Sequence, residues 1–121
     1  MLLGLIISLL LGILAGTFTG VSPGIHINLV GAILVSLSFS VLYKISPAYL
    51  VVFIVSMSIT HTFLDFIPSV LLGAPEDGTE LSVLPGHDML KKGLGLQAVS
   101  LTSLGCLYGV FVFIIDRKSV V

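Results

Sequence analysis

The first 43 residues of this chain contain no aspartate, glutamate, lysine or arginine. An ionised side chain at the centre of a bilayer costs about 2.5–3.5 kcal/mol on insertion scales, so membrane-spanning segments exclude such residues. A soluble domain has about a quarter of its residues charged, because its surface must be hydrated. Here 9% are charged, 56% are hydrophobic and the mean hydropathy is +1.22. The sequence therefore predicts an all-α integral membrane protein that crosses the cell membrane several times.

The length of 121 residues limits the number of crossings. One helical crossing takes about 20 apolar residues, so we expect about four transmembrane helices in a single transmembrane unit. Such a unit is small for a transport pathway, which predicts an oligomer or a companion membrane segment. The apolar stretches place the helices at about residues 2–18, 23–43, 47–64 and 93–115, with an irregular, external or re-entrant segment at 65–92.

Proline and glycine mark the helix boundaries. Ser22 is a good N-cap and Pro23 a good first helical residue, so the second helix is expected to begin at this Pro-Gly break. Asp77 and Glu80 have the spacing of a capping box, which predicts a short helix over about 78–84 that Pro85-Gly86 ends.

A stripe of small residues recurs at every fourth position of the first helix. Small residues let helix backbones approach closely in lipid, so we expect the stripe to pack against another helix. The last helix repeats the device, and its neighbouring Cys106 is interpreted as a small packing residue. The predicted packing positions are Gly4, Ser8, Gly12, Gly16, Gly20, Gly105 and Gly109.

The first candidate binding segment is Ser22–Asn28. A helix that begins here directs unpaired N–H groups and a positive dipole end into the break, which suits a carboxylate or phosphate oxygen. His26 and Asn28 are placed to add side-chain donors. The alternative interpretation is a helix-breaking turn with a histidine near the water interface.

The second candidate is an ionisable pair at the end of the third helix. His61 and Asp65 are four residues apart and share a helical face, and Thr60 supplies a hydroxyl beside them. Ionisable residues at the end of an apolar helix are candidates for relaying a proton or coordinating a cation. The alternative is an interfacial pair that caps the helix and faces water.

Several function classes lack support in the sequence. The net charge of −1 and the absence of a basic patch argue against a nucleic-acid partner. The chain has no nucleophile elbow, no P-loop and no paired metal-ligand motif, so we expect neither an enzyme, nor a metal site, nor a cofactor.

Three segments resemble the large membrane subunit of the tripartite tricarboxylate transporters, the TctA family, and its archaeal branch in particular. Residues 16–28, with Pro-Gly-Ile-His, are similar to the family's early Gly-x3-Gly-x2-Pro-Gly segment. Gly73-Ala-Pro75 resembles its Gly-x-Pro element, and residues 82–93 resemble its Asp-Gly-x-Pro-x4-Gly segment, with Pro85-Gly86 in place of Asp-Gly. The resemblance covers the N-terminal portion of the longer family members.

The resemblance implies a permease, or the N-terminal part of one, for secondary transport of small organic anions such as di- and tricarboxylates, coupled to H⁺ or Na⁺. Matching positions assign substrate binding to Pro23, Gly24, Gly73, Pro75 and, more loosely, Gly86. Their side-chain chemistry adds His26, Asn28 and His87 to the predicted substrate-binding residues. Ser22 and Ala74 are added as neighbours of the matched positions. The alternative function is a non-transporting membrane scaffold or accessory subunit that binds a partner through its glycine stripes.

Overall fold

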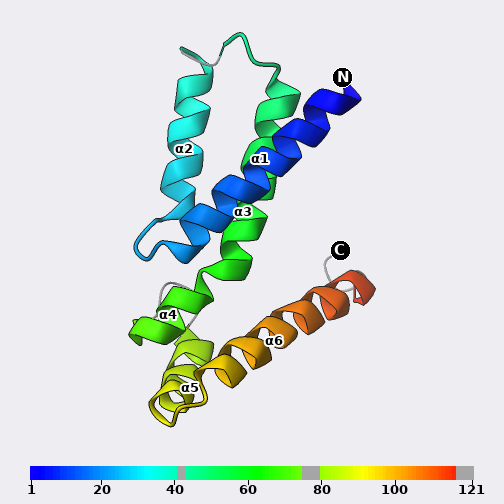
Figure 1. Cartoon of the computed structure of the whole chain (residues 1–121). Helices are drawn as coiled ribbons and strands as arrows, with labels where there is room; N and C mark the ends of the chain where they lie inside the picture. The colour runs from blue at the N-terminus through cyan, green and yellow to red at the C-terminus, as the bar shows by residue number, and fades with distance from the viewer. Residues whose placement is uncertain (41–42, 75–79, 117–121) are drawn as a thin grey trace. The chain divides into compact units, whose positions relative to one another are not determined.

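A computed structural model describes residues 1–40, 43–74 and 80–116, and these residues form six α-helices joined by turns (Figure 1). Contacts divide the chain into unit 1, Met1–Asp65, and unit 2, Phe66–Val121. The helices are α1 (Leu2–Val21), α2 (Ile27–Ser38), α3 (Pro47–Leu64), α4 (Phe66–Leu72), α5 (Glu80–Lys91) and α6 (Gly95–Ile115).

Three helical spans in the described residues are long and apolar enough to cross a membrane. They are α1, the 26-residue span Pro47–Leu72 that includes α3 and α4, and α6. The 12-residue α2 is apolar but shorter. The all-helical membrane architecture predicted from composition is therefore confirmed.

The boundary between α1 and α2 differs from the prediction. α1 extends to Val21, and Ser22 is its C-cap rather than the N-cap of the next helix. Pro23 explains the stop, because the residue before a proline is disfavoured in the α region, and Ser22 is extended with ψ 111°. Gly24 has φ +82°, the left-handed conformation found after proline in a type II turn. The Pro-Gly pair therefore forms a turn, and α2 begins only at Ile27.

The other end of α2 is also earlier than expected, at Ser38 instead of residue 43. Serine hydroxyls there donate hydrogen bonds to backbone carbonyls of α2. Ser38 Oγ donates to Val35 O at 2.6 Å, and Ser36 Oγ donates to Ala32 O at 2.9 Å. Such local bonds offer the backbone an alternative to helix continuation. The serine-rich sequence at this end therefore favours a turn.

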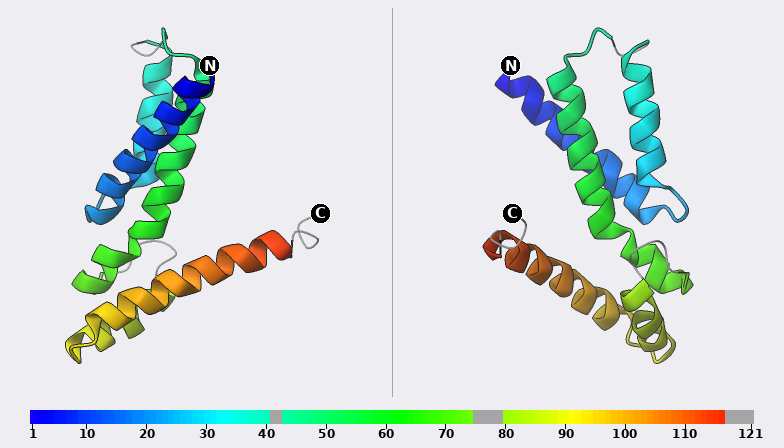
Figure 2. Two further views of the ribbon diagram at one scale, coloured as in Figure 1. Left: turned by 45° about the vertical axis from the view of Figure 1, so that its right-hand side comes forward. Right: turned by 180° about the vertical axis from the view of Figure 1, so that it is seen from behind.

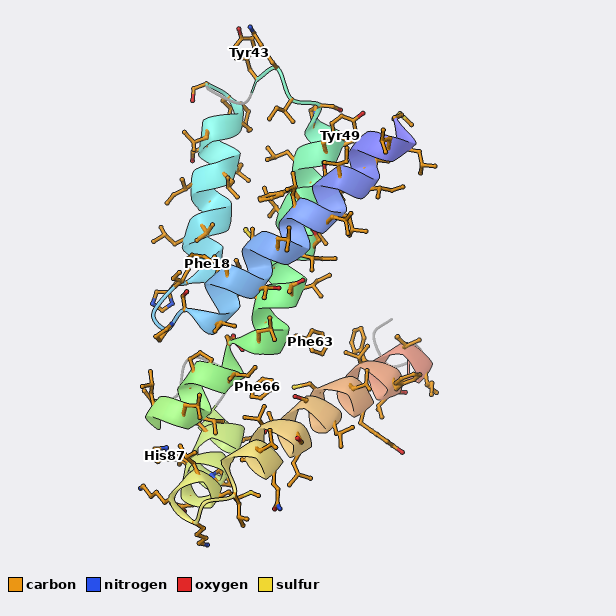
Figure 3. The ribbon with its side chains drawn as sticks, in the orientation of Figure 1. Phe18, Tyr43, Tyr49, Phe63, Phe66 and His87 are labelled. Carbon is orange, nitrogen blue, oxygen red and sulfur yellow. The ribbon has the colours of Figure 1, made fainter. Side chains whose placement is uncertain are left out.

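Unit 1 is built on close backbone contact between α1 and α3. Gly4 faces the ring of Tyr49, which Figure 3 labels on α3. A Cβ built at Gly12 would lie 2.5 Å from Phe53 O. A Cβ built at Gly20 would lie 2.9 Å from His61 O. The contacts advance in the same direction along both helices, so α1 and α3 are parallel.

The remaining helix of unit 1, α2, leads from the end of α1 back toward the start of α3, so it is antiparallel to both helices. It packs on α3, as Figures 1 and 2 show. Gly31 of α2 lies at ordinary contact distance from Ile54 of α3. Ser8, the polar member of the predicted stripe, lines an apolar cavity of about 270 Å³ together with Leu34 and Tyr49.

In unit 2, the stretch 66–72 and the described stretch 80–91 are helical, whereas we predicted an irregular segment over 65–92. Pro68 explains why α3 stops at Leu64, because proline cannot donate to the carbonyl four residues earlier and its ring clashes with it. Pro68 is tolerated within the first turn of α4.

α5 continues through Pro85 to Lys91 instead of ending at Pro85-Gly86. Proline removes one backbone hydrogen bond from the helix, and packing offsets this loss. Val83 is fully buried, and Gly86 is buried against Val70 of α4, where an added Cβ would lie 3.1 Å from both methyl groups. Asp77, the first residue of the predicted capping box, lies outside the described residues.

The core of unit 2 joins α4, α5 and the first turns of α6. Its buried members are Phe66, Val70, Val83 and Ala98. Most large side chains of α6 beyond Ala98 are exposed within this chain, from Leu101 to Ile115. Such an apolar surface suits contact with lipid or with further protein in the membrane.

The glycine contacts predict that Gly16→Ala destabilises unit 1. The new methyl group would collide with the carbonyl of Met57, and overpacking costs about 1–3 kcal/mol. We expect a lower midpoint of thermal unfolding for the purified protein in detergent. Gly109→Ala is the matched control, because no described atom lies within 4 Å of a Cβ at that position. Equal midpoints for the two variants would contradict the close contact.

Candidate functional site

The first candidate segment, Ser22–Asn28, is largely exposed. Ser22 is half-buried, and Pro23, Gly24, His26 and Asn28 are exposed. Among described residues, none comes within 4 Å of a Cβ built on Gly24, so the space beside its Cα is open. The segment therefore combines a left-handed glycine with two exposed side chains that can donate hydrogen bonds.

The amides at the start of α2 add backbone donors to this segment. His26 is the N-cap and makes no side-chain cap bond. The N–H groups of Leu29 and Val30 both donate to His26 O, at 3.0 and 3.2 Å. The first-turn amides without a partner inside the helix are then those of Ile27 and Asn28. Two amides and a positive helix end can accept an anion here.

The second candidate group lies at the end of α3. His61 is buried at 3% exposure, Thr60 faces Gly16 of α1, and Asp65 is half-buried. The N–H of Asp65 donates to His61 O at 2.9 Å and closes the last turn of α3.

The two candidate groups of unit 1 meet at the same end of the helix pair. Gly20, two residues before Ser22, faces the carbonyl of His61 and the side chain of Leu64. The parallel arrangement produces this proximity, since α1 and α3 both end here (Figure 1). The segment that can hold an anion is therefore next to the ionisable pair.

Thr19 is a member of this site that the sequence reasoning missed. Its hydroxyl oxygen lies 3.1 Å from Nδ1 of His61 and 3.2 Å from Gly16 O. The only signal in the sequence is its position beside Gly20 on the glycine-rich side of α1. That signal becomes informative once α3 is known to be the helix that packs there.

The third candidate group, in unit 2, forms around the end of α4. Gly73 has φ +67°, and the N–H of Ala74 donates to Ser69 O at 3.2 Å, the bond of a Schellman cap. His87 of α5, labelled in Figure 3, adds a bond from Nδ1 to Val70 O at 2.9 Å. A carbonyl only accepts, so Nδ1 of His87 carries a proton.

This geometry gives Gly73 and His87 a structural role, because the imidazole covers the glycine and satisfies a carbonyl in the last turn of α4. A Cβ on Gly73 would lie 2.8 Å from Nε2 of His87. Gly86 serves the close packing of α5 on α4 described above. A role of Gly73, Ala74, Gly86 or His87 in substrate binding stays a prediction, and Pro75 lies outside the described residues.

The predicted packing glycines of α6 have no such neighbour. No described atom lies within 4 Å of a Cβ built at Gly105 or Gly109. Gly105 and Cys106 line an open, mostly apolar groove of about 430 Å³ with Pro85, Gly86 and Met89 of α5. The packing partner of Gly105 and Gly109 therefore stays a prediction.

The helices and their polar turns define the class of this protein as a multi-pass helical membrane protein. The family model described as "Tripartite tricarboxylate transporter TctA family" matches residues 6–115. The chain therefore belongs to this family, whose description names a tripartite tricarboxylate transporter.

One relative is an uncharacterised protein of Methanocaldococcus jannaschii. It is 40% identical over 88 residues, which are 73% of this chain and 21% of the relative. The matched part of the chain thus spans about a fifth of the relative's length. No solved structure matches the chain.

The contact between Gly73 and His87 predicts that Gly73→Ala destabilises unit 2. Any L-residue at φ +67° is strained by about 1–3 kcal/mol, and here the methyl group also displaces the imidazole. Gly93→Ala is a matched control with φ +79° and no described atom within 4 Å of its Cβ. We expect a larger fall in the thermal unfolding midpoint for Gly73→Ala. Equal falls would contradict the ring contact.

Proposed function

We propose that this chain acts in a permease, as the whole or the N-terminal part of it, that carries small organic anions such as di- and tricarboxylates by secondary transport. The observation that carries the proposal is the open turn at Ser22–Asn28 in a chain of the TctA family. This turn offers first-turn amides of α2, space beside the Cα of Gly24 and two exposed donor side chains. No carboxylate occurs in the first 43 residues to repel a negatively charged guest.

The neighbouring polar group supplies candidates for ion coupling. Thr60, His61 and Asp65 lie at the end of the helix pair that also carries the anion turn. A cation or proton bound there favours a nearby anion through the electrostatic attraction of opposite charges. Binding of the two partners would then be mutually reinforcing, which is what coupled transport requires.

A second candidate function has one observation in its favour. Gly105 and Gly109 of α6 face open space within the described residues, and small residues of this spacing accept a partner helix. The chain would then serve as a membrane scaffold or accessory subunit. Association without anion binding would favour this role.

The anion turn predicts that His26→Ala weakens transport of citrate. Loss of a hydrogen bond to a charged group costs about 1.5–3 kcal/mol, so we expect the half-saturating concentration to rise at least about tenfold. The measurement is uptake of radiolabelled citrate and succinate into vesicles that contain the chain, with citrate-induced thermal stabilisation as the binding readout.

Lys44→Ala is the control for His26→Ala, because it removes a cation near the opposite end of α3. A wild-type chain that neither takes up nor binds a carboxylate would contradict the proposal. Uptake that is real but indifferent to His26→Ala would remove His26 from the site.

The coupling group predicts that Asp65→Asn abolishes the response of uptake to an ion gradient. The substitution keeps the size of the side chain and removes its charge. We expect exchange of the anion between equal concentrations on the two sides of the membrane to persist. Accumulation of the anion against its own concentration gradient should be lost. Asp88→Asn, an exposed carboxylate of α5, is the charge-matched control. Concentrative uptake that survives Asp65→Asn would exclude this carboxylate from coupling.

A further inference from the structure

We propose that Nε2 of His61 is a proton-binding site within the α1–α3 pair, and that Thr19 is the positioning residue that keeps this nitrogen available. The proposal rests on the proposed function where it names H⁺ as the coupling ion. The proton site itself depends only on the geometry of unit 1.

The first step is the location of His61 between two helices in a chain that spans a membrane. The residue is 3% exposed, and Gly20 brings the backbone of α1 against its carbonyl. An ionisable side chain at such a place is costly to charge and is characteristic of ion and proton pathways. His61 is also the residue type whose charge changes most easily near neutral pH.

The second step is the state of the ring. The Thr19 hydroxyl has a single hydrogen, and it lies within hydrogen-bond distance of both Gly16 O and His61 Nδ1. Both bonds form together only if the hydroxyl donates to the carbonyl and accepts from Nδ1–H. In that arrangement Nδ1 keeps its hydrogen, and the lone pair of the neutral imidazole is on Nε2.

The third step is the nitrogen that takes the proton. The hydrogen bond between His61 and Thr19 uses Nδ1. Nε2 is the ring nitrogen outside this bond, so it can take a proton without a turn of the ring.

The fourth step is the charge around the ring. α1 and α2, which pack against α3, contain no titratable side chain. The other titratable groups on this segment are Tyr49 of α3, three turns away, and Asp65, the C-cap of α3, one turn beyond His61. His26 is in the exposed turn at the same end. A positive ring at this end of α3 favours an anion at the turn.

The proposed step is a simple proton exchange. A proton from water bonds to the Nε2 lone pair and converts the neutral imidazole into an imidazolium with N–H groups at both positions. Release breaks the Nε2–H bond and returns the proton to water. Nδ1–H and its bond to Thr19 persist throughout, so the ring neither turns nor changes tautomer.

The test is nuclear magnetic resonance of the full chain in detergent micelles with ¹⁵N-labelled histidine, assigned by comparison with His61→Gln. At high pH we expect the Nδ1–H tautomer. On acidification of the folded protein we expect the new hydrogen on Nε2. A ring in the Nε2–H tautomer, or one that takes up no proton while the protein stays folded, would overturn the proposal.

Thr19→Val tests the positioning role, because valine keeps the shape of threonine and removes the hydroxyl. We expect the ratio of Nδ1–H to Nε2–H tautomer to fall about fivefold, the factor equivalent to one hydrogen bond of about 1 kcal/mol. Thr19→Ser should restore the wild-type ratio. Thr17→Val is the control, since Thr17 is exposed and bonds only to Ile13 O within α1. A ratio unchanged in Thr19→Val would exclude the positioning role.

Uptake measurements separate the proton site from the transport proposal. We expect an inward proton gradient to drive citrate accumulation in vesicles, and Thr19→Val to reduce it about fivefold. Accumulation driven by a sodium gradient alone would overturn H⁺ coupling and leave the permease standing. If no gradient drives uptake, the proposed function and the coupling role both fail, and the resonance experiment still decides whether His61 binds a proton.

Discussion

The close approach of two helix backbones determines the arrangement of unit 1. Carbonyl groups of α3 recur at four-residue intervals and face glycines of α1 with the same interval. Lipid removes the hydrophobic drive between helices, so dispersion and weak Cα–H···O contacts at short range become the main attraction. A side chain at a contact glycine would separate the backbones. The glycine spacing therefore determines which residues of the two helices are neighbours.

The polar chemistry of unit 1 is a consequence of this register. Thr19 is adjacent to a contact glycine and His61 supplies a contact carbonyl, so the backbone packing also brings hydroxyl and imidazole together. The turn after α1 is then next to the end of α3. A chain with few polar residues can in this way concentrate donors, a titratable ring and a carboxylate at one end of a helix pair.

Composition was sufficient to predict the helical membrane class, and the apolar stretch from residue 47 to 64 coincides with α3. The predicted start of α2 was wrong, because Ser22 has the right chemistry to cap the end of one helix or the start of the next. The helical path through Pro85 could not be predicted, since it depends on packing against Val70. Likewise, the partner of His61 follows from a contact between residues 42 positions apart.

The shortness of α2 has a consequence for the depth of the anion turn. Twelve residues of helix span about 18 Å, whereas the hydrocarbon core is about 30 Å thick. Because α1 and α3 are parallel, the chain must return across the membrane between them, and about 12 Å of that path is outside α2. Non-helical backbone at such depth requires protein or water around it, not acyl chains. This non-helical path is divided between the Pro23-Gly24 turn and the connection from Ser38 to Pro47, and wherever it lies below the headgroups it calls for water or further protein beside it.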